Sequence, residues 1–144
     1  MIAREAAYAA LFAQVSAVRG FNTVSRQLKA WADVAQPDQP ALFMAQGKQV
    51  AESTADNMPT RWKLMADLYV YVRNDDPALA LSCTTLNDLV DAIEAVLRPT
   101  PGYERQTLGG VVEHCRIAGD IETDEGVLGA QAVAIIPIEL FPEP

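Results

Sequence analysis

The stretch that decides the fold is WKLMADLYVYVR, residues 62–73, in which two kinds of side chain alternate. Successive side chains of a β-strand point to opposite faces of a sheet. One face here would be uniformly apolar and would carry Trp62, Leu64, Ala66, Leu68, Val70 and Val72. The other face would carry Lys63, Met65, Asp67, Tyr69, Tyr71 and Arg73. The alternation predicts an antiparallel strand that is buried on one side.

The chain after this strand predicts a helix and then more strands. Asn74 to Pro77 favours a turn. Residues 83–97 predict a helix that Thr84 or Thr85 caps, and its apolar stripe contains Leu86, Leu89, Val90, Ile93, Val96 and Leu97.

Two or three further strands are expected in the last third of the chain. Residues 111–118 alternate imperfectly, and residues 121–125 form an acidic segment that is typical of an edge strand. Residues 131–140 are apolar on both faces around Ile135 and Ile136, as in a central strand.

The chain before residue 62 predicts one helix and a hairpin. Residues 1–18 predict an amphipathic helix that Gly20 ends, and its apolar face contains Tyr8, Leu11, Phe12, Val15 and Val18. The β-branched pair Thr23 and Val24 indicates a strand over residues 21–28.

Residues 41–46 predict a second strand, with a turn near Gly47 and a hairpin return over residues 48–53. The polar residues 53–61 predict an exposed loop. Together the elements predict a single α+β domain, residues 1–144, in which two main helices pack on one face of a mostly antiparallel sheet.

Composition limits the partners that this domain can have. Half of the 144 residues are hydrophobic, and 11 Lys and Arg against 19 Asp and Glu give a net charge of −8. Such a charge disfavours nucleic acid and anionic membranes as main partners. No apolar run reaches the ~18 residues of a membrane span, and the charged residues within residues 1–18 indicate a soluble helix rather than a signal peptide. Two cysteines are too few for a disulfide scaffold and indicate a reducing cytoplasm.

The reactive side chains do not form a convincing active site. Glu113, His114 and Cys115 are adjacent, and a thiol needs a neighbouring base to act as a nucleophile. On a strand, however, His114 and Cys115 would point to opposite faces. Cys83 would approach only through a fold that the sequence does not define. An ordinary structural role is favoured for this set.

Metal and phosphate motifs fail in the same way. One histidine and two isolated cysteines lack paired zinc-ligand spacing. In an EF-hand loop beginning at Asp120, position six would be Glu125 instead of glycine. Gly109-Gly110 lacks the lysine and hydroxyl of a phosphate loop. The sequence therefore predicts a non-enzymatic domain with no catalytic residue, no cofactor and no metal. Trp31 and Trp62 are either interface anchors or residues that cover the sheet.

Two segments resemble a known family. They are FNTVSRQLKAWADVAQPDQPALF, residues 21–43, and RQTLGGVVEHCRIAGDIETDEGVLGAQAVAIIPIEL, residues 105–140. With the strand over 62–72 and the helix over 86–97, the layout resembles the small tail proteins of long-tailed bacteriophages and prophages. Within that group it is most similar to the tail terminators, which are also called minor tail or tail-completion proteins.

The resemblance implies a structural role in virion assembly. It implies a homo-hexameric ring at the head-proximal end of the tail tube, which ends tube polymerisation and prepares head–tail joining. The implied partners are further copies of the chain, the tail tube protein and the head–tail connector protein, and the implied place is the virion tail, with assembly in the host bacterial cytoplasm. Two alternatives remain: a head-completion or connector adaptor protein, and a cytoplasmic ligand-binding or enzymatic α+β domain.

The residues themselves predict where subunits would meet. Residues 46–61 are polar and contain Gly47 and Pro59, so we expect them to be flexible in an isolated subunit and ordered in an assembly. The candidate interface residues are Lys48, Glu52, Met58 and Arg61. Because every subunit carries −8, a free ring should be weak at low ionic strength.

Overall fold

A computed structural model describes residues 2–73, 82–99, 101–102, 104–125 and 131–143. It shows one α+β domain built on a six-stranded sheet in the order β1-β2-β3-β6-β4, with β5 also pairing with β6. The strands are β1 (Thr23–Ser25), β2 (Ala41–Glu52), β3 (Arg61–Arg73), β4 (Val112–Ile117), β5 (Glu122–Glu125) and β6 (Gln131–Pro142). Every pairing is antiparallel except that of β1 with β2, so the prediction of a mostly antiparallel sheet is confirmed.

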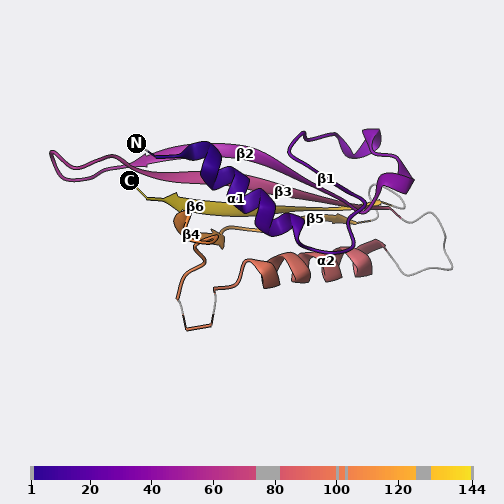
Figure 1. Cartoon of the computed structure of the whole chain (residues 1–144). Coiled ribbons are helices and arrows are strands. Elements are labelled where there is room, and N and C mark those ends of the chain that lie inside the picture. Colours follow the sequence, from indigo (N-terminus) through magenta and orange to yellow (C-terminus); the bar gives the residue numbers. More distant parts are fainter. Residues whose placement is uncertain (1, 74–81, 100, 103, 126–130, 144) are drawn as a thin grey trace.

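Two helices cover one face of this sheet, as predicted (Figure 1). They are α1 (Arg4–Ser16) and α2 (Ser82–Val96). Apolar side chains from both helices form one core with alternate residues of the central strands. Leu68 of β3 and Ile136 and Ile138 of β6 are completely buried there.

The alternation over residues 62–73 is confirmed, because Leu64, Ala66, Leu68 and Val70 are buried whereas the residues between them are half-buried. β3 lies between β2 and β6 in the middle of the sheet. Its apolar set faces the helices, and Trp62 is half-buried against the same core. On the other face Met65, Asp67 and Tyr69 are half-buried. The hydroxyl of Tyr8 on α1 donates a hydrogen bond to the Met65 carbonyl at 3.2 Å, which ties α1 to the strand.

Among the described residues, the face opposite the helices is covered at one end only. Two short 3₁₀ turns, η1 (Trp31–Asp33) and η2 (Gln36–Asp38), follow β1. Val34 packs there with Ala41, Phe43 and Tyr71 in a second, smaller cluster. Tyr71 is therefore buried, whereas its neighbours along the same face of β3 are not.

The predicted turn at Gly47 is wrong. β2 runs through Gly47 to Glu52, which pairs with Arg61 of β3. Gly47 lies where the register shifts between Gln46 and Gln49, and a Cβ there would come within 3.3 Å of the Met65 carbonyl oxygen. The glycine therefore permits a bulge and a close backbone approach instead of a turn. The loop of the hairpin is residues 53–60, all of them exposed, as predicted for this segment.

Some boundaries also differ from the prediction. The strand expected over 21–28 is limited to Thr23–Ser25, since only these residues pair with β2. The first helix ends at Ser16, four residues before Gly20, and the Ser16 hydroxyl donates to the Phe12 carbonyl.

The predicted cap of the second helix is wrong as well. α2 begins at Ser82, so Thr84 and Thr85 lie inside it. The turn expected over residues 74–77 lies outside the described residues. The last third of the chain, where two or three strands were predicted, contains the three strands β4, β5 and β6.

Candidate functional site

A long hairpin projects beyond the body of the domain (Figure 1). We call residues 46–61 of β2, β3 and their loop the arm. β6 pairs with β3 only from Leu64 onward, so beyond Gln49 the described residues of the hairpin form a two-stranded ribbon without a third strand. All of its residues are exposed, and Met58 in the loop has 62% of its surface exposed.

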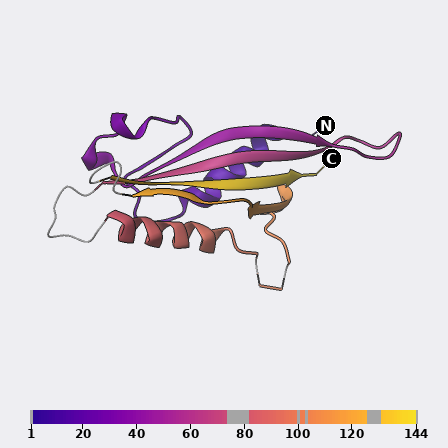
Figure 2. The ribbon, with the colours of Figure 1, turned by 180° about the vertical axis from the view of Figure 1, so that it is seen from behind.

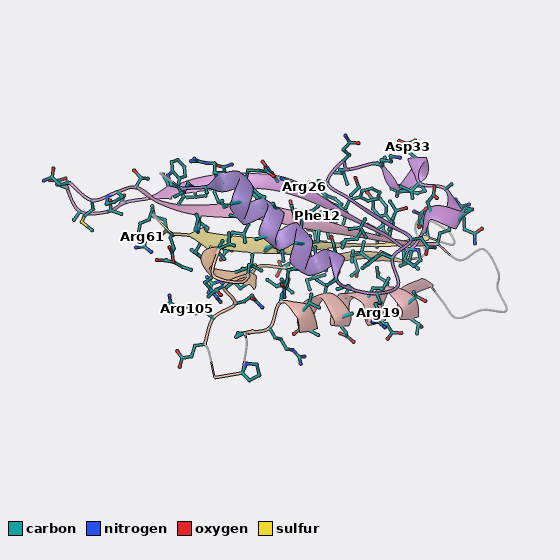
Figure 3. All side chains as sticks on the ribbon, in the orientation of Figure 1. Phe12, Arg19, Arg26, Asp33, Arg61 and Arg105 are labelled. Atoms are coloured by element: carbon teal, nitrogen blue, oxygen red, sulfur yellow. The ribbon has the colours of Figure 1, made fainter. Side chains whose placement is uncertain are left out.

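The base of the arm is attached to the body by charged side chains. The Arg4 Nε donates to the Gln49 Oε1 at 2.6 Å, and the Arg4 guanidinium lies 4.8 Å from the centre of the Trp62 ring. Arg61, marked in Figure 3, pairs with Glu113 across 2.5 Å. These contacts hold the base of the arm against the body, and none of them involves the loop, residues 53–60.

The four predicted interface residues all lie on this arm. Lys48, Glu52 and Met58 are exposed, and Arg61 is exposed although it pairs with Glu113. Their role between subunits stays a prediction.

The second feature is the open face, which we define as the side of the sheet away from α1 and α2. Figure 2 shows the molecule from this side. Half-buried side chains of β3 and β6 form its surface, namely Lys63, Met65, Asp67, Tyr69, Val133, Ile135, Pro137 and Glu139. Five of these eight side chains are apolar or aromatic, namely Met65, Tyr69, Val133, Ile135 and Pro137, and a partly exposed surface of this kind suits a partner.

One half of the open face is an acidic hollow. Two adjoining cavities of about 590 and 510 Å³ share Glu122 and Ile135, and we call them together the acidic hollow. Its carboxylates are Asp67, Asp120, Glu122 and Asp124, and its apolar lining includes Trp31, Met65, Tyr69, Val133, Ile135 and Pro137.

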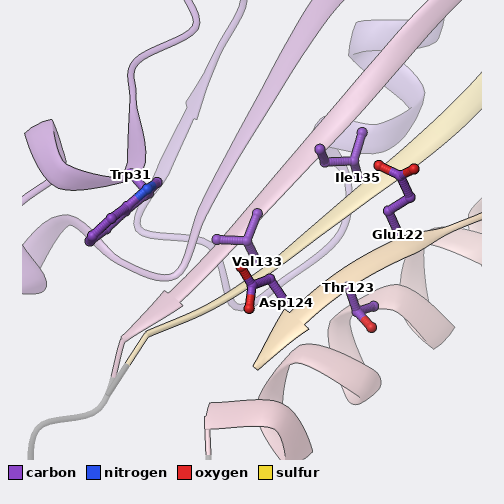
Figure 4. A pocket seen from close by; sticks show the side chains of 6 residues that line it. All are labelled: Trp31, Glu122, Thr123, Asp124, Val133 and Ile135. Atoms are coloured by element: carbon purple, nitrogen blue, oxygen red, sulfur yellow. The ribbon is translucent and has the colours of Figure 1, made fainter. Parts of the chain in front are cut away.

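The strand register explains how the hollow forms. Glu122 of β5 pairs with Ile135 of β6, and Asp124 pairs with Val133, so their side chains share one face (Figure 4). No ion pair within the described residues includes any of the four carboxylates. Burial, and then the nearby Glu122 carboxylate, raise the pKa of Asp67. The hollow therefore carries negative charge that nothing in the described part of the chain neutralises.

The other half of the open face carries cations in ion pairs. Glu139 accepts from Arg116 at 3.1 Å and lies 3.6 Å from Lys63. The Arg116 guanidinium lies 5.3 Å from the centre of the Phe141 ring. The two ends of the open face thus differ in charge. The hairpin end has cations that Glu139 partly neutralises, and the β5 end has carboxylates that form no ion pair with any described residue.

The residues considered for catalysis do not come together. His114 pairs with Phe141 in the sheet and Cys115 with Leu140, so their side chains point to opposite faces, as predicted. Burial raises the pKa of the Cys115 thiol to about 12, which keeps it protonated. Burial, and then the nearby charges of Arg116 and Arg105, lower the pKa of His114. The His114 Nδ1 accepts a hydrogen bond from the backbone N–H of Gln106 at 3.4 Å. The side chain of Cys83 lies outside the described part of the chain.

Two further observations concern sites and membranes. Among the described residues, no three His, Cys, Asp or Glu side chains are grouped closely enough to hold a metal ion. In the same part of the chain, neither helix has the length and apolar character that a membrane span needs.

The structure distinguishes the two tryptophans. Trp62 packs against the core and under Arg4. Trp31 is 38% exposed and lines the acidic hollow. The hollow itself could not be predicted from the sequence, because its walls come from segments that lie far apart along the chain.

The chain is thus an α+β domain with a projecting hairpin and an open sheet face (Figure 1). No family model matches the sequence, and no curated protein matches it significantly. The fold, however, is similar to that of a chain in the solved structure "Virion of native gene transfer agent (GTA) particle". The TM-score is 0.53 at 10% sequence identity, and the likeness covers 99% of this chain and 96% of that chain. At this identity the likeness shows a shared fold over nearly the whole of both chains.

Proposed function

We propose that this chain is a structural, non-enzymatic protein of a phage-like virion. In this role it forms a ring at the head-proximal end of the tail tube, ends tube polymerisation and prepares head–tail joining. The observation that carries the proposal is the fold shared end to end with a chain of the gene transfer agent virion. The terminator role in particular rests on the resemblance of residues 21–43 and 105–140 to tail terminators.

The surfaces of the domain suit a ring. A ring repeats one contact between two different patches of neighbouring subunits. The loop of the arm and the β5 end of the acidic hollow are two such patches, and they lie at opposite ends of the sheet (Figure 1). A hexamer is the number that the resemblance implies.

Free strand edges also favour an assembled state. Within the described residues, β1 pairs only with Ala41 to Phe43, so the remainder of β2 has a neighbour on one side alone. β4 and β5 form the opposite edge. Unpaired edges bind other strands unless they are covered, and neighbouring subunits or the tube protein would cover them.

The chemistry of the reactive residues supports a structural role. The Cys115 thiol is buried and protonated, and His114 lies on the other face of the strand. The partners that the resemblance implies are other copies of the chain, the tail tube protein and the head–tail connector protein. The proposed place is the virion tail, after assembly in the host bacterial cytoplasm.

Tail length in a deletion strain tests this function. Deleting the gene should give tubes of uncontrolled length, seen by negative-stain electron microscopy, and the wild-type gene should restore uniform, head-joined tails. Normal tail length with unjoined heads would contradict termination and favour the connector adaptor. Normal joined particles would contradict both.

A further inference from the structure

We propose that two copies of the free chain bind each other through their open faces, with Leu28 and Lys29 of each copy in the acidic hollow of the other. The contact is two-fold, so the pair closes on itself. The inference goes beyond the proposed function, because it concerns the chain before any ring forms.

A raised segment lies beside the hollow on the same face of the molecule. We call residues 27–30, which follow β1, the strap, and all four are exposed. The hydroxyl of Tyr71, a side chain of the open face of β3, donates to the Lys29 carbonyl at 2.8 Å. Directly after the strap, the Trp31 carbonyl accepts from the Gln131 Nε2 at 3.3 Å. The backbone is therefore anchored above the sheet, while the side chains of the strap remain exposed.

The strap offers one apolar and one cationic group next to each other. Leu28 is 45% exposed, more than any other large apolar side chain outside the arm in the described part of the chain. Lys29 forms no ion pair with any described residue, whereas the preceding Arg26 is paired with Glu5. Residues 26–32 contain no acidic side chain, so no negative charge accompanies the lysine.

The hollow has the complementary character. Its floor includes the half-buried side chains of Val133 and Ile135, which would bury the apolar side chain of the strap. Its four carboxylates form no ion pair with any described residue, and the Glu122 charge contributes to the raised pKa of Asp67. A lysine ammonium beside these carboxylates would relieve the repulsion between them.

The dimensions and the symmetry also agree. In the register of β6, Asp124 and Asp67 stand opposite Val133 and Pro137, so the hollow extends over about 13 Å at ~3.3 Å per residue. The four residues of the strap span about 10 Å on the same scale. Trp31 follows the strap and forms one side of the hollow, across from Glu122 (Figure 4). A two-fold axis beside Trp31 therefore places each strap over the hollow of the other copy, as an isologous contact requires.

The two-fold contact has a consequence for assembly. It covers the hollow, whose β5 end is one of the two patches proposed for the ring. A dimer must therefore separate before its copies can enter a ring, which would keep the free chain from forming rings away from the tube.

A charge exchange tests the contact by sedimentation equilibrium. At an ionic strength of ~0.15 M the overall repulsion between copies of charge −8 is largely screened, and the wild type should dimerise. Lys29→Glu and Glu122→Lys should each weaken dimerisation at least about tenfold, because each puts like charges together twice per dimer. An equimolar mixture of the two variants should recover dimers, since both contacts of the mixed pair again join opposite charges.

The matched charge controls are Arg19→Glu and Glu94→Lys. They change the net charge equally at exposed residues of the loop after α1 and of α2, away from the open face, and should dimerise like the wild type (Figure 3).

A second pair of variants tests the apolar part of the contact. Leu28→Ala should weaken dimerisation about tenfold, because two leucine side chains leave the interface of each dimer. Met58→Ala is the control, since Met58 is more exposed, at 62%, but lies in the loop of the arm outside the contact. The inference is wrong if the wild type stays monomeric at about 100 μM, if the strap and hollow variants dimerise like their controls, or if the mixture recovers no dimers.

Tail length in the deletion strain separates this inference from the proposed function. The strap belongs to neither patch proposed for the ring, so Lys29→Glu and Leu28→Ala should still restore uniform, head-joined tails. A monomeric wild-type chain that restores such tails would refute the dimer alone. A chain that dimerises as expected and leaves tube length uncontrolled would refute the terminator role alone.

Discussion

Replacing Gln106 should show how the segment between α2 and β4 is held. Only 7% of Gln106 is exposed. Its Nε2 donates to the Arg98 carbonyl just beyond α2 at 2.8 Å, and its Oε1 accepts from the Leu108 amide at 3.0 Å. The side chain thus joins the end of the helix to the approach to β4.

The expected cost follows from these two bonds. A hydrogen bond contributes ~0.5–1.5 kcal/mol net, and a buried polar group left without a partner costs ~1–3 kcal/mol. Gln106→Ala removes both bonds, and it leaves the buried Leu108 amide without its acceptor. We expect the free energy of unfolding to fall by about 2–3 kcal/mol, and Tm by about 10 °C for a domain of this size.

Urea unfolding followed by circular dichroism measures this loss. The midpoint should fall with the slope m unchanged. Gln27→Ala is the matched control, because Gln27 is exposed, and it should stay within ~0.5 kcal/mol of the wild type. If Gln106→Ala unfolds together with the Gln27→Ala control, the hydrogen bonds described here do not hold the segment.

Three further predictions concern titration, the reactive pair and the arm. Folding raises the pKa of Asp67, so the contribution of this carboxyl to stability falls as pH rises from its unfolded pKa of about 4 through its raised folded pKa. Asp67→Asn should therefore be more stable than the wild type at pH 7 and lose that advantage near pH 3, and equal stability at pH 7 would contradict the raised pKa. His114→Ala and Cys115→Ser should leave tail assembly intact, with a stability cost of ~1–3 kcal/mol for the buried serine hydroxyl; a folded double variant that fails to assemble would contradict the structural role of β4. Amides of residues 46–61 should exchange rapidly in the monomer, because an unsupported two-stranded ribbon is marginally stable, and slowly in the assembly; strong protection throughout the arm in the monomer would refute this.

The strands and helices were predictable where the spacing of apolar residues within one element shows which of its faces is buried. The alternation in β3 identifies the buried face because every second side chain meets the helices. The stripe of α2 is predictable for the same reason, since Leu86, Leu89 and Ile93 are all buried against that core. Local periodicity is sufficient for such elements.

Prediction from the sequence failed where the role of a residue depends on a partner elsewhere in the chain. Gly47 suggested a turn because glycine is common in turns, but its role is set by the Met65 backbone on the neighbouring strand. Nothing near Val34 indicates that it covers Tyr71. Asp67 was correctly placed on the polar face, yet its acidic environment depends on Glu122, which only the register of β5 with β6 brings close.

Cryo-electron microscopy of purified tails tests the central claim most directly. With the chain carrying a C-terminal density label, we expect six labelled copies in one ring at the head-proximal end of each tube and none along the tube. Label along the tube or at the distal end, or tails of normal length without label at either end, would contradict the account.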